Sequence, residues 1–510
     1  MNLLPAAALD VALEMPPHRL SGVVYGALLN HRPQLAALGD AVQQPPYKAP
    51  PRAPVLAVRP RNTLASAGHS VPVPADAAAL RVEAQLGLVI GRTACRVAEA
   101  DALGHLAGVL PVVDFSLPLD SHYRPGVRFK ARDGSCLLGP RVQPLAALPA
   151  GPDALGLRVF VDGRLAQTGD TGDRLRGAAR LIAEVSAFMT LSPGDVLLLG
   201  ASHGAPLARA GQAVAVELDG LGRLETVLQA EPPAPRPASN RAAAAAVAAA
   251  APADLRPTAR VAFDGAIHTA TPHPAGLQLA DGRVLAEDQV TWLPPVEVGT
   301  VIALGLNYAD HVKELAKELT VSAQDEPLVF LKGPGALVGH RGHTRRPADA
   351  AFMHYECELA VVIGRPARGV AEAEAMAHVA GYTVCNDYAV RDYLENWYRP
   401  NLRVKNRDGA TALGPWFVPA AAVADPHALA LRTRVNGQLT QQGSTAQMIH
   451  RIPALIAYLS SFMTLLPGDV ILTGTPDGVV NVNPGDEVVC EIDGIGRLVN
   501  TLAPDTACGR

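Results

Sequence analysis

Short runs of apolar residues, separated by Gly, Pro and Asp, dominate the hydrophobic pattern of this chain. Clear examples lie at 301–304, 328–331, 359–363 and 470–473. Such runs are typical of buried strands. Helical spacing occurs chiefly at 311–319, 371–379 and 447–463, and Pro453 is expected to kink or restart the last of these helices. The pattern predicts a β-rich mixed α/β fold, a compact mixed sheet or roll rather than a regular β-α-β succession.

The pattern occurs twice along the chain. SAFMTLSPGDV at 186–196 returns as SSFMTLLPGDV at 460–470, and LVIGR, KARDG and DGLGRL return in the same order as VVIGR, KNRDG and DGIGRL. Four collinear blocks indicate a tandem duplication. We predict one domain over 1–230 and a second over 261–510. Between them, 231–260 is an Ala/Pro-rich linker whose composition fits either a short helix or a disordered segment.

Two glutamates of the second half are candidate metal ligands. Glu356 and Glu358 flank Cys357 and directly precede the apolar run 359–363. Alternate residues of a strand share a face, so the two carboxylates project together. Like charges at this distance need a proton or a cation between them, and an all-oxygen set suits Mg²⁺ or Mn²⁺. Asp387, in CNDYAVRD, is the third candidate. An ordinary charged edge strand is the alternative, and the apolar run argues against it.

A second candidate pair is His311 and Glu314, three residues apart at the start of a helical pattern. This spacing places both side chains on one helix face. A carboxylate beside a histidine orients the ring and raises its basicity, as a general base or water activator requires. The same spacing is common on exposed helices, so a solvent-facing pair without a function is the alternative.

Six motifs of the second half, in their order along the chain, resemble the fumarylacetoacetate hydrolase superfamily: GLNYADHVKEL, PLVFLKGPGAL, HYECELAVVIG, NDYAVRD, RVKNRDG and GDVILTGTPDGV. The resemblance covers both halves and implies two tandem domains with that family's mixed β-sandwich roll. The residues to which it assigns metal ligation are Glu356, Glu358 and Asp387. The resemblance assigns catalysis to His311, Glu314 and Lys405. It places His311 and Glu314 on a mobile segment that closes over the site. Those to which it assigns binding of substrate anions are Lys332, Arg391 and Thr475.

The tandem arrangement is similar to fused two-domain members of this family in aromatic (4-hydroxyphenylacetate) catabolism. It implies Mg²⁺-dependent decarboxylation of 5-oxopent-3-ene-1,2,5-tricarboxylate and isomerisation of 2-hydroxyhepta-2,4-diene-1,7-dioate, through an enolate that the metal stabilises. An acylpyruvate C–C hydrolase on the same metal site is the alternative among enzymes, and a non-catalytic metal-dependent scaffold is the alternative outside them. Leu306 stands where family members acting on small acylpyruvates often have Arg, so the substrates need not be theirs.

The first half retains only part of the candidate site. The positions that align with it are Gln34, Ala37, Arg59, Glu83, Gln85, Asp114, Lys130 and Ala201. The acid/base pair is absent there, and Gln85 stands opposite Glu358, which leaves a site of lower charge that binds a divalent ion more weakly. We predict that the first half mainly packs against the second as an internal pseudo-dimer. The alternative is that each half catalyses one reaction, because an amide oxygen can ligate Mg²⁺.

Charge and composition restrict the partners. A formal net charge of -4 and the absence of a basic stripe argue against nucleic acid. The six cysteines lack the paired spacing of a zinc site or disulfide framework, which indicates reduced thiols. Asp10 and Glu14 interrupt the apolar N-terminus, and the apolar run 242–251 is too short to span a membrane. We expect a cytoplasmic protein with a small di- or tricarboxylate substrate, and homo-oligomerisation is left open.

Overall fold

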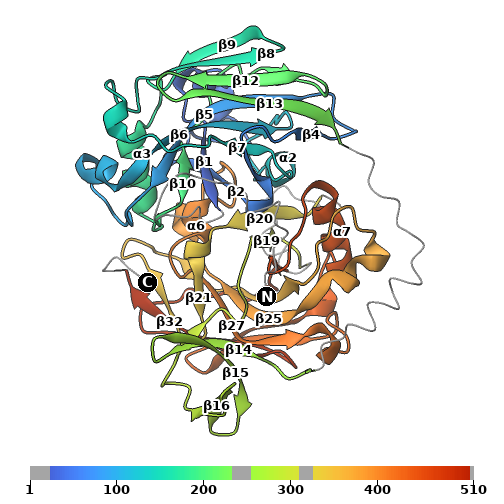
Figure 1. The fold of residues 1–510 in the computed structure, drawn as a ribbon. Coiled ribbons are helices and arrows are strands. Elements are labelled where there is room, and N and C mark those ends of the chain that lie inside the picture. Colours follow the sequence, from blue (N-terminus) through green and yellow to red (C-terminus); the bar gives the residue numbers. More distant parts are fainter. Residues whose placement is uncertain (1–22, 232–253, 309–325, 506–510) are drawn as a thin grey trace.

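The computed structural model describes residues 23–231, 254–308 and 326–505, which form two halves lying one above the other (Figure 1). The large sheet of the first half follows the order β2 (Val55–Arg59), β1 (Val24–Leu28), β10 (Val196–Leu198), β5 (Leu80–Ile90), β6 (Leu106–Ser116), β7 (Cys136–Leu138), β3 (Leu64–Ser66), with β11 (Leu207–Ala208) paired to β5. Its smaller sheet follows the order β4 (Val71–Val73), β13 (Gly222–Ala230), β12 (Ala213–Leu218), β8 (Gly156–Val161), β9 (Arg164–Asp170).

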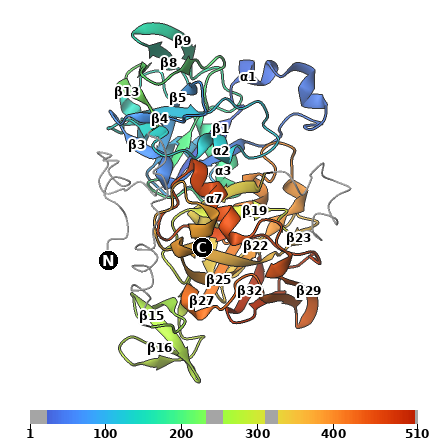
Figure 2. The same ribbon diagram turned by 90° about the vertical axis from the view of Figure 1, so that its right-hand side faces the viewer.

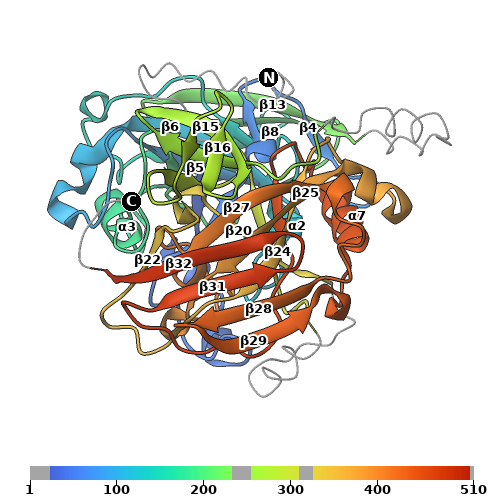
Figure 3. The same ribbon diagram turned by 90° about the horizontal axis from the view of Figure 1, so that it is seen from below.

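The second half repeats this strand order. Its large sheet runs β20 (Leu328–Lys332), β19 (Val301–Gly305), β30 (Val470–Leu472), β24 (Cys357–Ile363), β25 (Val379–Asp387), β27 (Thr411–Pro419), β21 (Leu337–Gly339). Its smaller sheet runs β22 (His343–Arg346), β32 (Gly496–Pro504), β31 (Glu487–Ile492), β28 (Ala430–Val435), β29 (Gln438–Ser444), and Figure 3 shows it crossing the large sheet as a second layer. The tandem, β-rich fold predicted from the repeat is therefore confirmed.

The apolar runs explain the buried position of the central strands. β24 is buried at every residue, and both of its neighbours, β25 and β30, pair with it antiparallel. β19 and β30 pair in parallel, as β1 and β10 do in the first half. A strand with an unbroken apolar run can be covered on both faces, and this places the acidic residues at the start of β24 beside the core.

Helices are few and short. They are α1 (Arg32–Ala36), α2 (Val127–Lys130), α3 (Ala178–Ser186), α6 (Leu402–Lys405) and α7 (Ile452–Phe462) in the described part of the chain. Pro453 lies in the first turn of α7, so the helix restarts there, as expected. The segment expected to be helical at 371–379 forms a 3₁₀ helix, η7 (Glu372–His378), which links β24 to β25. None of the described helices combines the length and apolar character needed to cross a bilayer.

A third sheet, which the sequence pattern did not indicate, precedes the second large sheet. It comprises β17 (Val284–Leu285), β16 (Gly276–Leu279), β15 (Ala266–His273), β14 (Ala259–Phe263) and β18 (Thr291–Leu293). It projects from the second half at the end remote from the first (Figures 1 and 2). Trp292 attaches it through edge contacts with Trp416 and His340. β14 begins at Ala259, inside the range 231–260 predicted as linker.

The two halves make matched polar contacts with each other. The carboxylate of Asp408 accepts hydrogen bonds from the backbone N and Oγ1 of Thr190, at 2.9 and 2.5 Å. The equivalent carboxylate of the first half, Asp133, accepts from the backbone N and Oγ1 of Thr464, at 2.8 and 2.5 Å. One apolar core cluster also includes residues of both halves. The two halves are therefore in contact, and the Asp133 and Asp408 contacts occupy equivalent positions.

Candidate metal centre and the cleft beside it

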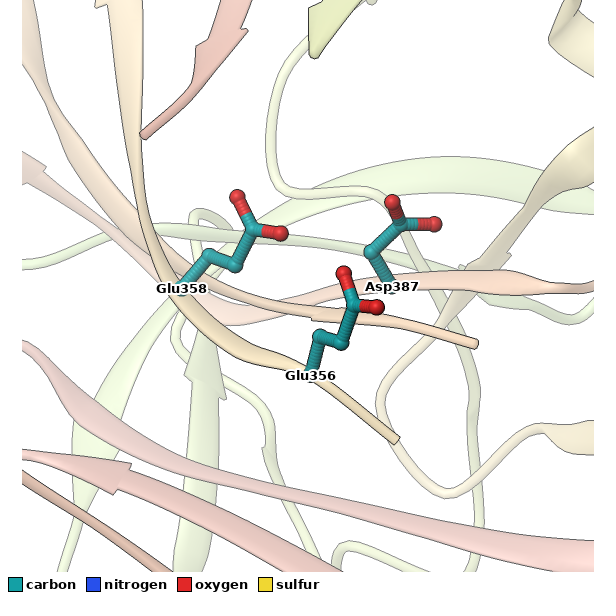
Figure 4. A group of neighbouring side chains, drawn as sticks. All are labelled: Glu356, Glu358 and Asp387. Carbon is teal, nitrogen blue, oxygen red and sulfur yellow. The ribbon is translucent and has the colours of Figure 1, made fainter. Parts of the chain in front are cut away.

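Three carboxylates converge at the point where β24 begins and β25 ends. Glu356 precedes β24, Glu358 lies in it, and Asp387 is the last residue of β25. The backbone N of Asp387 donates to the carbonyl of Glu356 at 2.9 Å, which fixes the two strand ends together. One ligand atom from each side chain lies within 4.8 Å of the others (Figure 4). Among the described residues, no other group of three or more acidic, histidine or cysteine side chains is this close.

Two lysines and a backbone amide hold these carboxylates. Lys405 Nζ, at the end of α6, lies 2.7 Å from Glu356 Oε2 and 3.0 Å from Asp387 Oδ2. Lys332 Nζ, at the end of β20, donates to Asp387 Oδ1 and to the carbonyl of Lys405. Glu358 Oε2 accepts from the N–H of Gly474 at 2.6 Å. If all three carboxylates are ionised, they leave one negative charge in excess over the two ammonium groups, and only a bound cation or a proton can balance it.

A turn that requires glycine positions this amide. Gly474 has a φ of 87°, in the left-handed region that L side chains rarely adopt. An added Cβ would lie 3.0 Å from the Cβ of Asn307, which leaves little space for a side chain. The Asn307 amide donates to the carbonyl of Thr473 at 2.8 Å and so fixes the other side of the turn. This packing explains the glycine in the GTP motif.

The electrostatics of the cluster favour a bound cation. Burial, and then the charges of Asp387 and Glu356, raise the pKa of Glu358 well above its ordinary value. Burial alone would lower the pKa of Lys405, but the adjacent carboxylates of Asp387 and Glu356 outweigh it and raise that pKa. A buried all-oxygen set with one excess negative charge is what Mg²⁺ or Mn²⁺ requires, so these residues fit a divalent ion.

A cleft opens beside the carboxylates. The residues that line it, within the described part of the chain, are Arg124, Leu304, Gly305, Leu306, Leu328, Phe330, Glu356, Arg391, Leu394, Arg399, Pro400, Lys405 and Thr475. Leu306 holds a φ of 60°, and a non-glycine residue in this region is a strained position of the kind found at functional sites. The cleft combines cationic and apolar walls, which suits a small anionic molecule.

The candidate binding residues lie differently with respect to this cleft. Arg391 and Thr475 line it. Thr475 Oγ1 donates to the carbonyl of Cys357 at 2.9 Å and accepts from Gln441 Nε2 at 3.0 Å. Lys332 is fully buried against Asp387 and is not part of the lining. Lys332 therefore contacts Asp387, a candidate metal ligand, and does not face the cleft in which a substrate would lie.

The acid/base pair, His311 and Glu314, lies outside the described residues, but the segment just before it is in place. Tyr308 forms a bridge with Met448. Burial and the nearby Glu358 charge raise the pKa of the Tyr308 hydroxyl.

Both halves of the chain resemble one known protein family. The profile of the fumarylacetoacetate (FAA) hydrolase C-terminal family matches residues 23–229 and 300–503. The chain belongs to the fumarylacetoacetate hydrolase family. Both halves of this family member are matched, so the resemblance inferred from the six motifs is confirmed.

Three relatives of this hydrolase-family chain match it over most or all of their own length. The 4-hydroxyphenylacetate degradation bifunctional isomerase/decarboxylase of Escherichia coli is 44% identical over 486 residues, which are 95% of this chain and 99% of that protein. The mitochondrial oxaloacetate tautomerase FAHD2A of Homo sapiens is 41% identical over 228 residues, 43% of this chain and 71% of that protein. The solved 2-hydroxyhepta-2,4-diene-1,7-dioate isomerase of Mycobacterium marinum is 34% identical with a TM-score of 0.42, and covers 49% of this chain and 100% of that chain.

In the first fumarylacetoacetate hydrolase domain, side-chain cations neutralise the equivalent site. Arg59 donates to Asp114, and Gln85 Nε2 donates to the same carboxylate at 3.2 Å. Lys130 Nζ lies 2.8 Å from Glu83 Oε2. Burial alone would raise the pKa of Glu83, but the charge and hydrogen bond of Lys130 outweigh it, so this pKa is lowered. Two carboxylates face two cations, so this site has no excess charge for a metal ion.

Aromatic side chains fill the space above this first-half site. Trp397, from the second half, stacks on Tyr47 with ring centroids 4.0 Å apart. Trp397 and Tyr398 are both buried in an apolar cluster with first-half residues such as Leu29 and Ala57. Leu29 and Ala57 align with Leu306 and Phe330, which line the cleft of the second half. The second half thus occupies the position where a first-half cleft would open.

Proposed function

We propose that the second half carries out both reactions expected of the chain: decarboxylation of 5-oxopent-3-ene-1,2,5-tricarboxylate and isomerisation of 2-hydroxyhepta-2,4-diene-1,7-dioate, in 4-hydroxyphenylacetate catabolism. The observation that carries the proposal is the cluster of Glu356, Glu358 and Asp387 beside a cationic cleft. The similarity to the E. coli isomerase/decarboxylase, 44% identity over 95% of this chain, supports the choice of reactions. The scattered cysteines support a cytoplasmic location.

Mg²⁺ or Mn²⁺ is the proposed cofactor, held by the three carboxylates. Such an ion would supply a Lewis acid that draws electrons from a 2-oxo acid. Lys405 holds Glu356 and Asp387 in place, and we assign Lys332 to positioning Asp387 because it meets that carboxylate and not the cleft. Arg391 and Thr475 lie where a substrate carboxylate would be bound.

Both reactions require a proton at one defined carbon. Loss of carbon dioxide leaves an electron pair on the carbon chain, and isomerisation removes a proton at one carbon and returns it at another. We propose that His311, oriented by Glu314, carries this proton. The apolar wall of the cleft at Leu304, Leu328 and Phe330 would limit the access of bulk water, so that the proton comes from the side chain.

For the first half we propose a supporting role: it packs against the second half as an internal pseudo-dimer. Neutralised carboxylates and a cleft filled by Trp397 and Tyr398 support it. The matched contacts of Asp133 and Asp408 across the interface support the pseudo-dimer.

Replacing His311 with alanine is expected to lower the rate of isomerisation roughly a hundredfold, because proton transfer loses its base, while the carboxylate cluster keeps its metal affinity. The reaction is run in D₂O and followed by NMR, which detects both substrate loss and deuterium at the new position. Calorimetric titration with Mn²⁺ reports on metal binding. Unchanged deuterium incorporation in His311→Ala would remove the histidine from the mechanism. A wild type that releases pyruvate from an acylpyruvate and turns over neither proposed substrate would favour the hydrolase alternative.

A further inference from the structure

Two related segments, one from each half, meet between the two sites. HYRPGVRFK at 122–130 and WYRPNLRVK at 397–405 share the tripeptide Tyr-Arg-Pro, and each ends on the lysine of its own site. Their backbones are hydrogen-bonded: Tyr398 N donates to the carbonyl of His122 at 2.7 Å, and Arg399 N donates to the carbonyl of Tyr123 at 2.8 Å. The two copies of this motif are therefore fixed side by side across the interface.

The arginines of both copies line the same cleft. Arg124, from the first half, and Arg399 are part of the lining of the second-half cleft, together with Arg391. Arg124 Nη1 donates to the carbonyl of Arg399 at 3.4 Å, and its guanidinium lies 4.6 Å from the centre of the Tyr123 ring. A second cavity, between Lys130 and Lys405, has no arginine among the described residues that line it. The first half thus places its arginine at the site of the second.

The described lining of the cleft is mainly cationic. Its ionisable side chains within the described residues are Arg124, Arg391, Arg399, Lys405 and Glu356. Lys405 holds Glu356 and Asp387 in place. The three guanidinium groups offer a longer substrate further sites at which a carboxylate can bind. Arginine is the side chain best suited to paired hydrogen bonds with a carboxylate.

The chemistry of the two proposed substrates indicates which carboxylate is bound there. The tricarboxylate has one carboxylate next to its oxo group and two at the far end. One of the far carboxylates leaves as carbon dioxide, and a guanidinium bound to it would stabilise the charge that must disappear. The other far carboxylate stays, and the isomerisation substrate also has it. A fixed arginine serves both reactions only if it binds the carboxylate that stays.

We propose that Arg124 binds this remote carboxylate, so that the first half contributes a specificity-determining residue to the site of the second. The inference rests on the proposed function for the identity of the substrates. It gives the first half a direct part in substrate recognition even though its own site has lost its excess charge. It also predicts a preference for 2-oxo acids with a second, remote carboxylate over short 2-oxo acids.

The test compares a long and a short ligand on Arg124→Gln. Dissociation constants are measured by calorimetry in the presence of Mg²⁺ for 2-oxoheptanedioate, which has the remote carboxylate, and for pyruvate, which lacks it. Loss of a charge-assisted pair is expected to weaken binding of 2-oxoheptanedioate roughly 10- to 100-fold. Pyruvate affinity is expected to stay within about twofold, because pyruvate does not reach the arginine. With the two natural substrates, the same variant is expected to raise KM more than it lowers kcat.

Two further variants make the result decisive. Arg164→Gln removes an exposed arginine from β9 of the same half and is expected to bind both ligands like the wild type. Arg124→Lys keeps the charge and is expected to lose less affinity than the glutamine variant, and it carries the test if the glutamine variant does not fold. Unchanged affinity for 2-oxoheptanedioate in Arg124→Gln, or an equal loss for pyruvate, would overturn the proposal. A wild type that binds 2-oxoheptanedioate without turning over the tricarboxylate contradicts the proposed function and leaves the arginine test intact.

Discussion

Replacing Glu358 with glutamine is expected to lower turnover on the order of a thousandfold and, in the metal-free protein, to raise the midpoint of thermal unfolding. The substitution turns three carboxylates and two lysines into a neutral set, the balance that Glu83, Gln85 and Asp114 have in the first half. A site without excess negative charge binds a divalent ion weakly. The same change removes a buried carboxylate that lies close to two others, which is why stability and activity should change in opposite directions.

The pH dependence of stability gives an independent check on Glu358. The folded-state pKa of this carboxyl lies well above its ordinary value because of burial and the charges of Asp387 and Glu356. Its contribution to stability is therefore complete below the ordinary pKa and is lost as the pH rises through the raised one. As the pH rises from acidic to neutral, the midpoint of thermal unfolding of the metal-free wild type is expected to fall. The midpoint of metal-free Glu358→Gln is expected to fall less.

Gln85→Met, at the equivalent place in the first half, is the matched control for Glu358→Gln. It removes no charge, so turnover should remain that of the wild type. Calorimetry with Mn²⁺ and scanning calorimetry with EDTA measure the two effects. Full metal affinity in Glu358→Gln would exclude this residue as a ligand.

A pair of double variants is expected to separate the roles of the two halves. Glu356→Gln with Lys405→Met should lower turnover of both substrates by at least a hundredfold, because a candidate ligand and the lysine that holds two carboxylates are both lost. Glu83→Gln with Lys130→Met removes the equivalent ion pair and should leave turnover unchanged. In each variant both partners are replaced, so neither leaves the other's charge buried alone, and both should fold.

The two rates are compared by ultraviolet absorbance with each substrate separately. Loss of decarboxylation alone in one double variant, and of isomerisation alone in the other, would support the alternative that each half catalyses one reaction. Such a result would also show that the neutral set around Asp114 is compatible with catalysis.

Much of the fold was predictable because its strands are short and strongly apolar. The repeat indicated two domains, and the alternation of Glu356 and Glu358 placed two carboxylates on one face without any structural information. The sheet of β14 to β18 was missed because its longest strand, β15, is largely exposed and contains His, Thr and Pro. Its first strand also overlaps the Ala- and Pro-rich range that composition assigned to the linker.

Residues that act across long sequence separations were the hardest to predict. The position of Lys332 against Asp387 depends on how β20 and β25 pack, which spacing does not reveal. Arg124 was missed because it belongs to the half whose own site is neutralised, and only folding brings it to Arg399. The repeated Tyr-Arg-Pro, directly upstream of both site lysines, is the sequence signal that would have identified it. The roles of His311 and Glu314 remain predictions from the resemblance.

The most direct test of a single metal-dependent site in the second half is removal and return of the metal. Protein treated with EDTA is given the tricarboxylate, and the decay of its ultraviolet absorbance and the subsequent tautomerisation of the dienol are recorded before and after addition of Mg²⁺. We predict that both steps stop together and recover together, in the wild type and in the Glu83→Gln with Lys130→Met variant alike. Either step continuing at full rate in the presence of EDTA would contradict the account.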